Sequence, residues 1–217
     1  MNGDKLLAVY GKSGYGREVM PLLNSSKIFA NNVVQVFIDD TPSADLVNDY
    51  PVCSYEHFIS AISSDKSLVI AIADGRIRHK IAQKCKADAI TFLSVSANQH
   101  VRMDNCNVGE GAIFSPYTVL TSNIQIGVHF HCNIYSYVAH DCIIGDFVTF
   151  APGVKCNGNV VVEDFAYIGT GAILKQGTPD KPLRIGTGAI IGMGAVVTKD
   201  VAPGETVIGN PARPMQR

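Results

Sequence analysis

The clearest pattern in the chain is an apolar position that recurs every sixth residue. A second small or apolar position lies two residues before most of its members, and small or polar residues usually follow. A helix repeats near 3.6 residues and an ordinary strand at 2, so a period of six indicates another geometry. Hexapeptide repeats are typical of a β-helix, in which each repeat forms one face of a narrow prism. The recurring residues are Val108, Phe114, Leu120, Ile126, Cys132, Val138, Ile144, Phe150, Cys156, Val162, Ile168 and Leu174.

The repeat loses its phase after Leu174 and resumes at Ile185, Ile191 and Val197. The extra residues fall in the stretch 177–184, GTPDKPLR, whose turn formers predict a loop that leaves the coil. The array amounts to about five coils, too narrow to enclose a substrate. We therefore expect function on the outer surface or between subunits.

The chain before the repeat alternates apolar runs with helical stretches. This alternation predicts a parallel sheet with helices on its faces. We therefore expect two domains: an α/β, Rossmann-like nucleotide-binding domain over residues 1–95 and a β-helix over residues 96–217. The expected strands are 5–10, 33–38, 68–73 and about 89–92, and the expected helical stretches are 17–24 and 76–86.

A glycine-rich turn, GKSGYG, follows the first expected strand and opens a helix, and two acids end the second strand. Amides at a helix N-terminus favour phosphate, and an acid at the next strand tip can accept a hydrogen bond from a base or ribose. The motif reads G-x-x-G-x-G in a small domain, which disfavours a dehydrogenase. A turn without ligand, and acids that cap a helix or face solvent, are the alternatives. The candidate nucleotide-site residues are Gly11, Ser13, Gly14, Tyr15, Gly16, Asp39 and Asp40.

Composition narrows the class of protein. A formal charge of −1 with 47% hydrophobic residues argues against nucleic acid or an anionic membrane as the main partner. Because no basic segment precedes an apolar run, and no 18-residue apolar stretch occurs, we expect a cytoplasmic protein. The six cysteines contain no CxxC pair. Four of them, Cys106, Cys132, Cys142 and Cys156, occupy inward positions and are expected to pack in the core.

His140 follows an inward position, so its ring is expected outside the prism at a coil corner. The adjacent Asp141 can hold one ring nitrogen protonated and leave the other free as a base. An ordinary surface histidine is the alternative. The remaining expectations are a surface location for His57 and His79 and a place at or near a coil turn for His129 and His131.

The motifs together resemble a known family. The run NIYSYVAHDC at 133–142, IGDF at 144–147, the opening YGKSGYG and the closing IGNPA at 208–212 are similar to those of nucleotide-sugar acetyltransferases with a left-handed β-helix. The resemblance is to bacterial 4-amino-sugar N-acetyltransferases acting on bacillosamine, viosamine or perosamine precursors; sialic acid O-acetyltransferases share the architecture. It implies acetyl-CoA as co-substrate, no metal, and a homotrimer with active sites between subunits.

The resemblance also implies residue roles. His140 matches the general base and Asp141 the acid that supports it. Some relatives carry a second histidine where this chain has Thr149, which can donate a hydrogen bond but cannot titrate, so the resemblance carries over no second titrating group. The residues that match the cofactor site are Asn133, Gly158, Thr170, Gly192, Met193 and Gly194.

The activity implied is direct attack of a sugar C4 amine on acetyl-CoA, for a nucleotide-linked 4-amino-4,6-dideoxyhexose that feeds a surface glycan such as O-antigen. Our first candidate acceptor is dTDP-4-amino-4,6-dideoxyglucose, followed by a UDP-linked bacillosamine precursor and GDP-perosamine. O-acetylation of a sugar is the alternative enzyme. A zinc enzyme, with His129, His131 and His140 converging across an interface, and a non-catalytic nucleotide-sugar sensor are the remaining alternatives.

Overall fold

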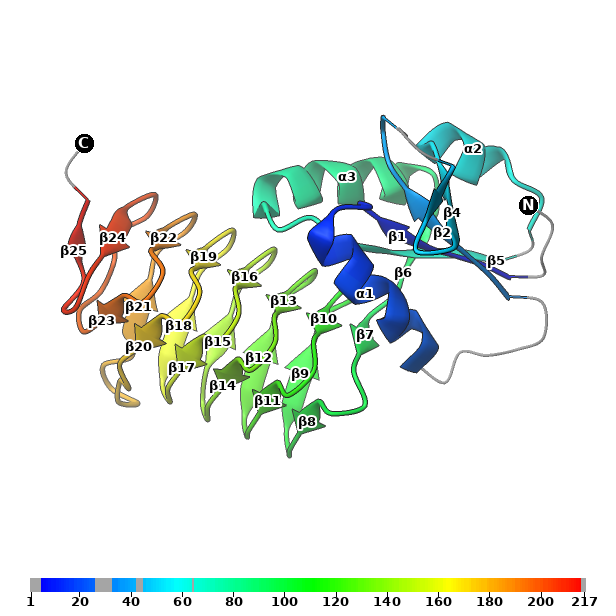
Figure 1. The fold of residues 1–217 in the computed structure, drawn as a ribbon. Helices are drawn as coiled ribbons and strands as arrows, with labels where there is room; N and C mark the ends of the chain where they lie inside the picture. Colours follow the sequence, from blue (N-terminus) through cyan, green and yellow to red (C-terminus); the bar gives the residue numbers. More distant parts are fainter. Residues whose placement is uncertain (1–4, 26–32, 42–44, 64, 216–217) are drawn as a thin grey trace.

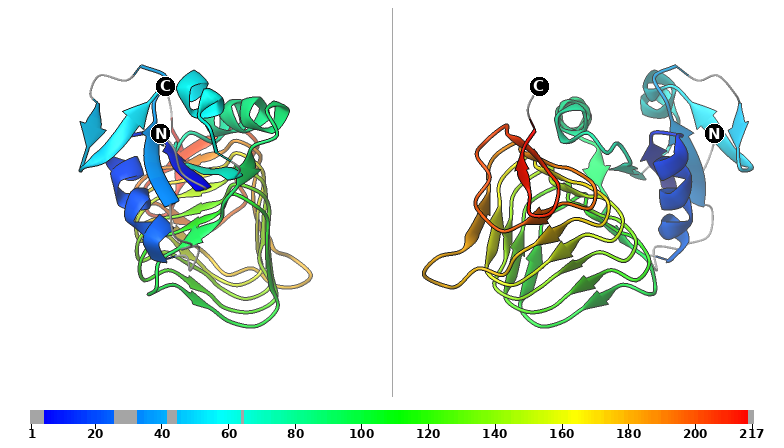
Figure 2. Two further views of the ribbon diagram at one scale, coloured as in Figure 1. Left: turned by 90° about the vertical axis from the view of Figure 1, so that its right-hand side faces the viewer. Right: turned by 60° about the vertical axis from the view of Figure 1, so that its left-hand side comes forward.

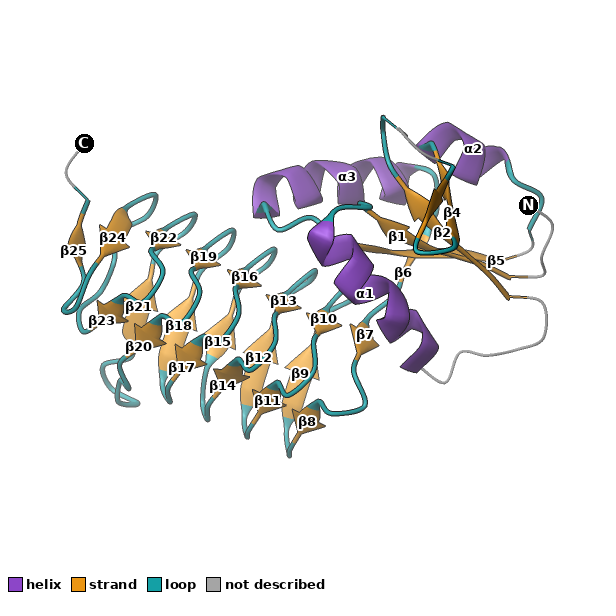
Figure 3. Cartoon of the chain, viewed as in Figure 1, coloured by secondary structure: helices purple, strands orange, loops and turns teal. Residues whose placement is uncertain are grey.

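The computed structural model describes residues 5–25, 33–41, 45–63 and 65–215. A sheet with three helices is followed by a stack of short strands that forms a three-sided prism (Figures 1 and 3). Within these ranges no helix is long and apolar enough to cross a bilayer.

The first sheet has the strand order β3-β4-β2-β1-β5-β6. All its pairs are parallel except β3 with β4, so the carboxyl ends of β1, β2 and β5 lie at one edge. Strand β1 pairs with β2 on one side and with β5 on the other, so the strand order reverses at β1. In folds of this kind ligands bind beyond the carboxyl ends of the strands at such a reversal. The elements are β1 (Lys5–Tyr10), α1 (Gly14–Ser25), β2 (Val33–Ile38), β3 (Leu46–Val47), β4 (Tyr50–Cys53), α2 (Tyr55–Ser60), β5 (Asp65–Ile70), α3 (Gly75–Ala87) and β6 (Thr91–Phe92).

The sequence predicts this sheet well, with local differences. β1 and β2 have the expected bounds, whereas β5 lies three residues before the expected 68–73 and α1 begins at Gly14 rather than residue 17. The elements β3, β4 and α2 were missed because they are short. Helix α2 depends on a local cap, in which the Ser54 hydroxyl accepts a hydrogen bond from the His57 amide at 3.2 Å.

Three parallel sheets form the faces of the prism, and on face 1 each coil up to β19 takes eighteen residues: Ile113 pairs with His131, and His131 with Thr149. The next coil, which contains the loop, is longer, since Tyr167 pairs with Ile190. Face 1 contains β7 (Val95–Ser96), β10 (Ile113–Phe114), β13 (His131–Cys132), β16 (Thr149–Phe150), β19 (Tyr167–Ile168), β22 (Ile190–Ile191), β24 (Thr206–Ile208) and the antiparallel β25 (Arg213–Pro214). Face 2 contains β8 (Val101–Arg102), β11 (Val119–Leu120), β14 (Tyr137–Val138), β17 (Lys155–Cys156), β20 (Ile173–Leu174) and β23 (Val196–Val197). Face 3 contains β9 (Cys106–Val108), β12 (Ile124–Ile126), β15 (Ile143–Ile144), β18 (Val160–Val162) and β21 (Leu183–Ile185).

The six-residue pattern reports the core correctly, because its members from Phe114 to Val197 are buried inside the prism. The four array cysteines are buried in the same core, as expected. The pattern misses the first coil, because Ser96 and Arg102 stand where the next coil has Phe114 and Leu120. The parallel β-helix-like architecture is thereby confirmed; the left-handed sense of its coils stays a prediction.

The expected loop leaves the prism between β20 and β21, but it begins and ends two residues earlier than predicted. Leu183 and Arg184 belong to β21 rather than to the loop, because they pair with β18 on face 3. The excursion is therefore 175–182, closed by hydrogen bonds between Thr178 and Lys181. In the left view of Figure 2 this loop protrudes from the prism on the side away from the first sheet.

The first sheet and the prism are joined by a fully buried arginine on α3, Arg78. Its guanidinium donates to the carbonyls of Ile72 at 2.5 Å and Ala73 at 3.2 Å, just beyond β5. It also donates to the carbonyls of His129 at 3.1 Å and Phe147 at 2.7 Å, at the corner between faces 3 and 1. Burial lowers the pKa of the Arg78 side chain to about 10. One cation thus fixes the end of β5 against the coils.

Replacing Arg78 by Met should destabilise the fold, because methionine fills similar space and leaves several buried carbonyls without a donor. We expect a loss of about 3 kcal/mol in the free energy of unfolding. At fixed protein concentration this lowers Tm by roughly 6–12 °C in a thermal melt. Arg76→Met is the control, since Arg76 is exposed on the same helix; equal melting of the two variants would contradict the role of Arg78.

Candidate functional site

The glycine-rich turn lies at the carboxyl end of β1, where α1 begins at Gly14. Two glycines are required by the close packing of the turn. A Cβ on Gly16 would lie 1.8 Å from the Gly11 carbonyl oxygen, and Gly11 has a φ of +104°. The Ser13 carbonyl accepts from the Arg17 amide at 3.0 Å, so the first amides of α1 are left for another acceptor. The turn has the geometry of an anion-binding helix start.

Both acids at the end of β2 have fixed partners that the sequence did not reveal. The Asp39 carboxylate pairs with the Lys12 ammonium at 2.8 Å, and Asp40 accepts from the Tyr10 hydroxyl at 2.5 Å. Burial, with the hydrogen bond to Asp40, raises the pKa of the Tyr10 phenol. The edge beside the turn therefore presents two oriented carboxylates and one lysine.

Tyr15, expected as a nucleotide contact, also packs on the prism. Its ring packs against the His131 imidazole on face 1, with ring centroids 5.3 Å apart. Burial raises the pKa of the Tyr15 hydroxyl. Tyr15 thus anchors the turn to the prism.

His140 and Asp141 form a hydrogen-bonded pair at the corner between faces 2 and 3. His140 Nδ1 lies 2.7 Å from Asp141 Oδ2, and the two side chains are 48% and 47% exposed. The hydrogen bond from His140, with a second from Asn123, lowers the pKa of the Asp141 carboxyl. An ionised Asp141 holds the Nδ1–H tautomer, which leaves Nε2 free as a proton acceptor at the surface.

Gly158 lies directly beside the His140 ring, one coil further along the same corner. A Cβ on Gly158 would come within 2.5 Å of His140 Cε1 and Nε2. The next residue back, Asn157, accepts a hydrogen bond from the Tyr137 hydroxyl at 2.8 Å. Gly158, expected as a cofactor contact, therefore also provides the space in which the imidazole lies.

The other expected cofactor residues lie on a different corner, between faces 1 and 2. The Asn133 side chain accepts from the Ile134 amide at 2.7 Å, and the Thr170 carbonyl accepts from the Gly194 amide at 2.8 Å. Met193, between Gly192 and Gly194, is 81% exposed. These residues follow one edge of face 2, and His140 lies at its other edge.

The nucleotide-site residues and His140 do not meet within one chain. The first sheet and α3 cover face 1 and its corner with face 3, through contacts such as His131 Nε2 to the Ile70 carbonyl at 2.9 Å. The corner that carries His140 joins the two remaining faces, opposite face 1.

The structure places Thr149 and three histidines more exactly; His129 lies at a coil turn as expected, whereas His131 and His79 differ from their expectations. Thr149 is buried on face 1, donating to the Ala73 carbonyl at 2.8 Å, so it lies on a different face from His140. His131 is buried within a strand rather than at a turn, and His129 is buried at a turn against Phe147. His79, expected at the surface, is half-buried and packs against the same phenylalanine.

Burial of these side chains removes the basis of the zinc alternative. His129 and His131 are 2% and 1% exposed, so neither can reach a neighbouring subunit. Burial lowers the pKa of His129 to about 4. Over the part of the chain that the structure describes, no three metal-ligating side chains of the His, Cys, Asp or Glu type lie together.

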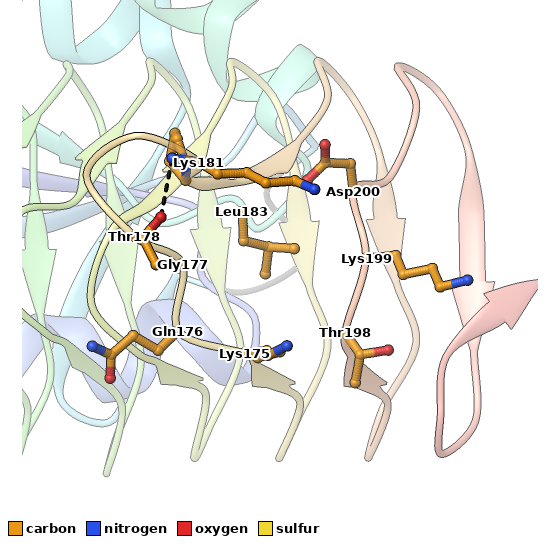
Figure 4. Close-up of a pocket in the computed structure, with 10 residues that line it drawn as sticks. Lys175, Gln176, Gly177, Thr178, Lys181, Leu183, Thr198, Lys199 and Asp200 are labelled. Carbon is orange, nitrogen blue, oxygen red and sulfur yellow. Dashed lines mark hydrogen bonds between the residues drawn. The ribbon is translucent and has the colours of Figure 1, made fainter.

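A hollow of about 580 Å³ lies at the base of the loop 175–182, on the same prism edge as His140 (Figure 4). Three lysines from the loop and the adjacent coils, Lys175, Lys181 and Lys199, line it together with Thr178 and Asp200. The hollow therefore lies on the same edge as His140, closer to the C-terminal end of the prism.

Comparison with known proteins identifies the family. A family model described as the PglD N-terminal domain matches residues 6–85. The GDP-perosamine N-acetyltransferase of Escherichia coli O157:H7 is 48% identical over 214 residues, covering 98% of this chain and 97% of that protein. The chain belongs to the nucleotide-amino-sugar acetyltransferases. As a member of this family it is an acetyl-CoA-dependent N-acetyltransferase, as the resemblance implied.

Two solved structures agree with this assignment. WeeI from Acinetobacter baumannii AYE superposes with a TM-score of 0.93 at 54% identity, and the match covers 97% of this chain and 100% of WeeI. The acetyltransferase domain of PglB from Neisseria gonorrhoeae FA1090, in complex with acetyl coenzyme A, gives 0.87 at 27% identity, covering 99% and 100%. Both structures share the fold described above, and the second contains the acyl donor of the family.

Replacing Gly158 by Ala should impair turnover, because the added methyl would displace the His140 ring. A misplacement of about 1 Å can cost roughly 10²-fold in kcat. Steady-state kinetics with acetyl-CoA would measure the loss, and a melt would check the fold. Gly204→Ala is the control: its φ of +70° makes the backbone cost larger, but no atom lies within 4 Å of the new Cβ. Wild-type kcat in the Gly158 variant would refute the packing argument.

Proposed function

We propose that the enzyme transfers the acetyl group of acetyl-CoA to the C4 amine of a nucleotide-linked 4-amino-4,6-dideoxyhexose, with His140 as general base. The observation that carries the proposal is the exposed His140–Asp141 pair, whose hydrogen bond occupies Nδ1 and leaves Nε2 available as a proton acceptor. Family membership supplies the acyl donor and the class of acceptor.

The chemistry requires only positioning and one proton acceptor. The acceptor nitrogen attacks the thioester carbonyl, a C–N bond forms, and the C–S bond breaks to release the thiolate of coenzyme A. His140 Nε2 takes the proton that the amine loses, while Asp141 stabilises the imidazolium. The proton then passes to the departing sulfur, which yields the free thiol and restores neutral His140.

GDP-perosamine now replaces dTDP-4-amino-4,6-dideoxyglucose, which the sequence alone ranked first, as our first candidate acceptor; the dTDP-linked sugar and a UDP-linked bacillosamine precursor follow. The relative at 48% identity over nearly the whole chain bears that name. The two carboxylates at the end of β2 also favour guanine, which offers N1–H and N2–H donors, whereas thymine and uracil offer a single N3–H. Asp39 and Asp40 are the residues we assign to the base, and Gly11–Gly16 to the diphosphate.

A second copy of the chain completes the active site in this proposal. Residues 1–95 hold the nucleotide sugar and residues 96–217 transfer the acetyl group, but the two candidate sites lie on opposite sides of one prism. A homotrimer, which the family resemblance implies, would bring His140 of one subunit to the nucleotide turn of the next. In the groove between prisms, we assign Asn133, Gly158, Thr170 and 192–194 to the pantetheine arm and the hollow with three lysines to the phosphates.

A thiol-release assay with acetyl-CoA and a panel of acceptors tests the assignment. We expect fastest turnover with GDP-perosamine, slower turnover with dTDP- and UDP-linked 4-amino sugars, and none with the matching 4-hydroxy sugars. Each donor lost between guanine and the two carboxylates should cost about 1–3 kcal/mol, or roughly 5- to 160-fold in kcat/KM. Preference for a hydroxyl acceptor would replace the proposal by O-acetylation.

His140→Ala should lower kcat by about 10²–10⁴-fold, the usual contribution of a general base. Binding of acetyl-CoA, measured by calorimetry, should be unchanged because the ring does not hold the cofactor. His57→Ala serves as control, since His57 is an exposed residue of α2. A His140 variant with wild-type turnover would remove His140 from the mechanism.

A further inference from the structure

A column of asparagines runs through the corner that carries the catalytic pair. Asn105, Asn123, Asp141 and Asn159 follow one another at intervals of eighteen residues, one per coil. All four have positive φ, between +55° and +58°. Asparagine and aspartate adopt this left-handed conformation more readily than other residues with a Cβ. The acid replaces asparagine only in the coil in which His140 precedes it.

The side chains of this column are joined by hydrogen bonds. Asn105 Nδ2 donates to Asn123 Oδ1 at 3.3 Å, and Asn123 Nδ2 donates to Asp141 Oδ1 at 3.3 Å. The other carboxylate oxygen, Asp141 Oδ2, accepts from His140 Nδ1 at 2.7 Å. Asp141 is thus held from both sides, with one oxygen on the amide of Asn123 and the other on the imidazole.

We propose that Asn123 is a positioning residue for the reaction, which sets the orientation of Asp141 and through it the tautomer and aim of His140. This inference rests on the proposed role of His140 as base.

The exposure of the pair explains why such a residue is needed. His140 and Asp141 are about half exposed. A carboxylate in water is free to rotate about χ1 and χ2 and to exchange its partner for solvent, so burial does not fix this pair. A donor on the remaining oxygen restricts that rotation and favours the ionised form. Asn123 supplies the donor from the coil below, whose position is set by the strand pairing of faces 2 and 3.

The column also provides a matched control. Asn105 has the same backbone conformation as Asn123 and is likewise exposed. Its side-chain amide also donates one hydrogen bond to the next residue of the column, but that residue is Asn123 rather than Asp141. Glycine accepts positive φ without strain, so Asn123→Gly and Asn105→Gly each remove a side chain and leave the corner conformation allowed. A purely structural role of the column would give the two variants similar effects.

The experiment is steady-state kinetics on both glycine variants of the full chain, with acetyl-CoA and the preferred acceptor of the panel. We expect Asn123→Gly to lower kcat about tenfold with KM for both substrates nearly unchanged, since loss of a hydrogen bond to a charged group is worth at least that factor. Asn105→Gly should lower kcat by no more than about twofold because its bond is one step removed. Equal kcat values for the two variants, with similar Tm, would overturn the inference.

A double-mutant cycle separates this inference from the proposed function. If Asn123 acts through Asp141, then Asn123→Gly should have no further effect on kcat in an Asp141→Asn background. An additional tenfold loss there would show that Asn123 acts by another route. His140→Ala decides the proposed function independently: wild-type turnover in that variant refutes the base, whereas a loss there together with unchanged turnover in Asn123→Gly refutes only the positioning role.

Discussion

The coil length of eighteen residues is the constraint on which the rest of this structure depends. On face 1 the strand pairing keeps this spacing from β7 to β19, so in these coils a side chain lies beside the residue eighteen positions away. This single rule places the His140 ring against Gly158 and joins Asn123 to Asp141. It also stacks Phe147 on Phe165, with ring centroids 5.6 Å apart. The side chains of a site on such a scaffold lie in columns of residues eighteen positions apart, so these neighbours can be found in the sequence.

The joint between the two parts obeys a different principle. Arg78 is a buried cation whose hydrogen-bond partners are carbonyl and hydroxyl oxygens; none of the ion pairs formed by the described residues includes it. Several oriented carbonyl dipoles therefore compensate the lost hydration of the guanidinium. Such a joint is directional, because five donors in a fixed fork fit only one arrangement of acceptors. It holds Ala73 and the end of β5 against face 1, and so gives the nucleotide turn a fixed place on the prism.

Much of this was predictable because periodic burial leaves a strong signal. The core of the prism, the loop after Leu174 and the strands β1 and β2 follow from spacing alone. The first coil did not, because Ser96 and Arg102 break the apolar period while strand pairing continues. Contacts between the two parts also have no sequence signal: nothing in a single chain shows that Tyr15 packs on His131, or that Arg78 lies among carbonyls. Such contacts depend on packing across the joint, which no local pattern records.

The positioning partner of Asp141 was visible in the sequence but required a different period. Searching for apolar residues every six positions finds the core and passes over the corners. Reading the corner residues every eighteen positions gives asparagine, asparagine, aspartate and asparagine. The column one residue earlier contains Ser122, His140 and Gly158. A column whose residues satisfy the same backbone conformation should keep one identity for structural reasons. At Asp141 this column gains a charge next to the His140 ring, and in the following coil Gly158 lacks a side chain. The backbone conformation does not explain these two changes, whereas the proposed role of His140 as base does.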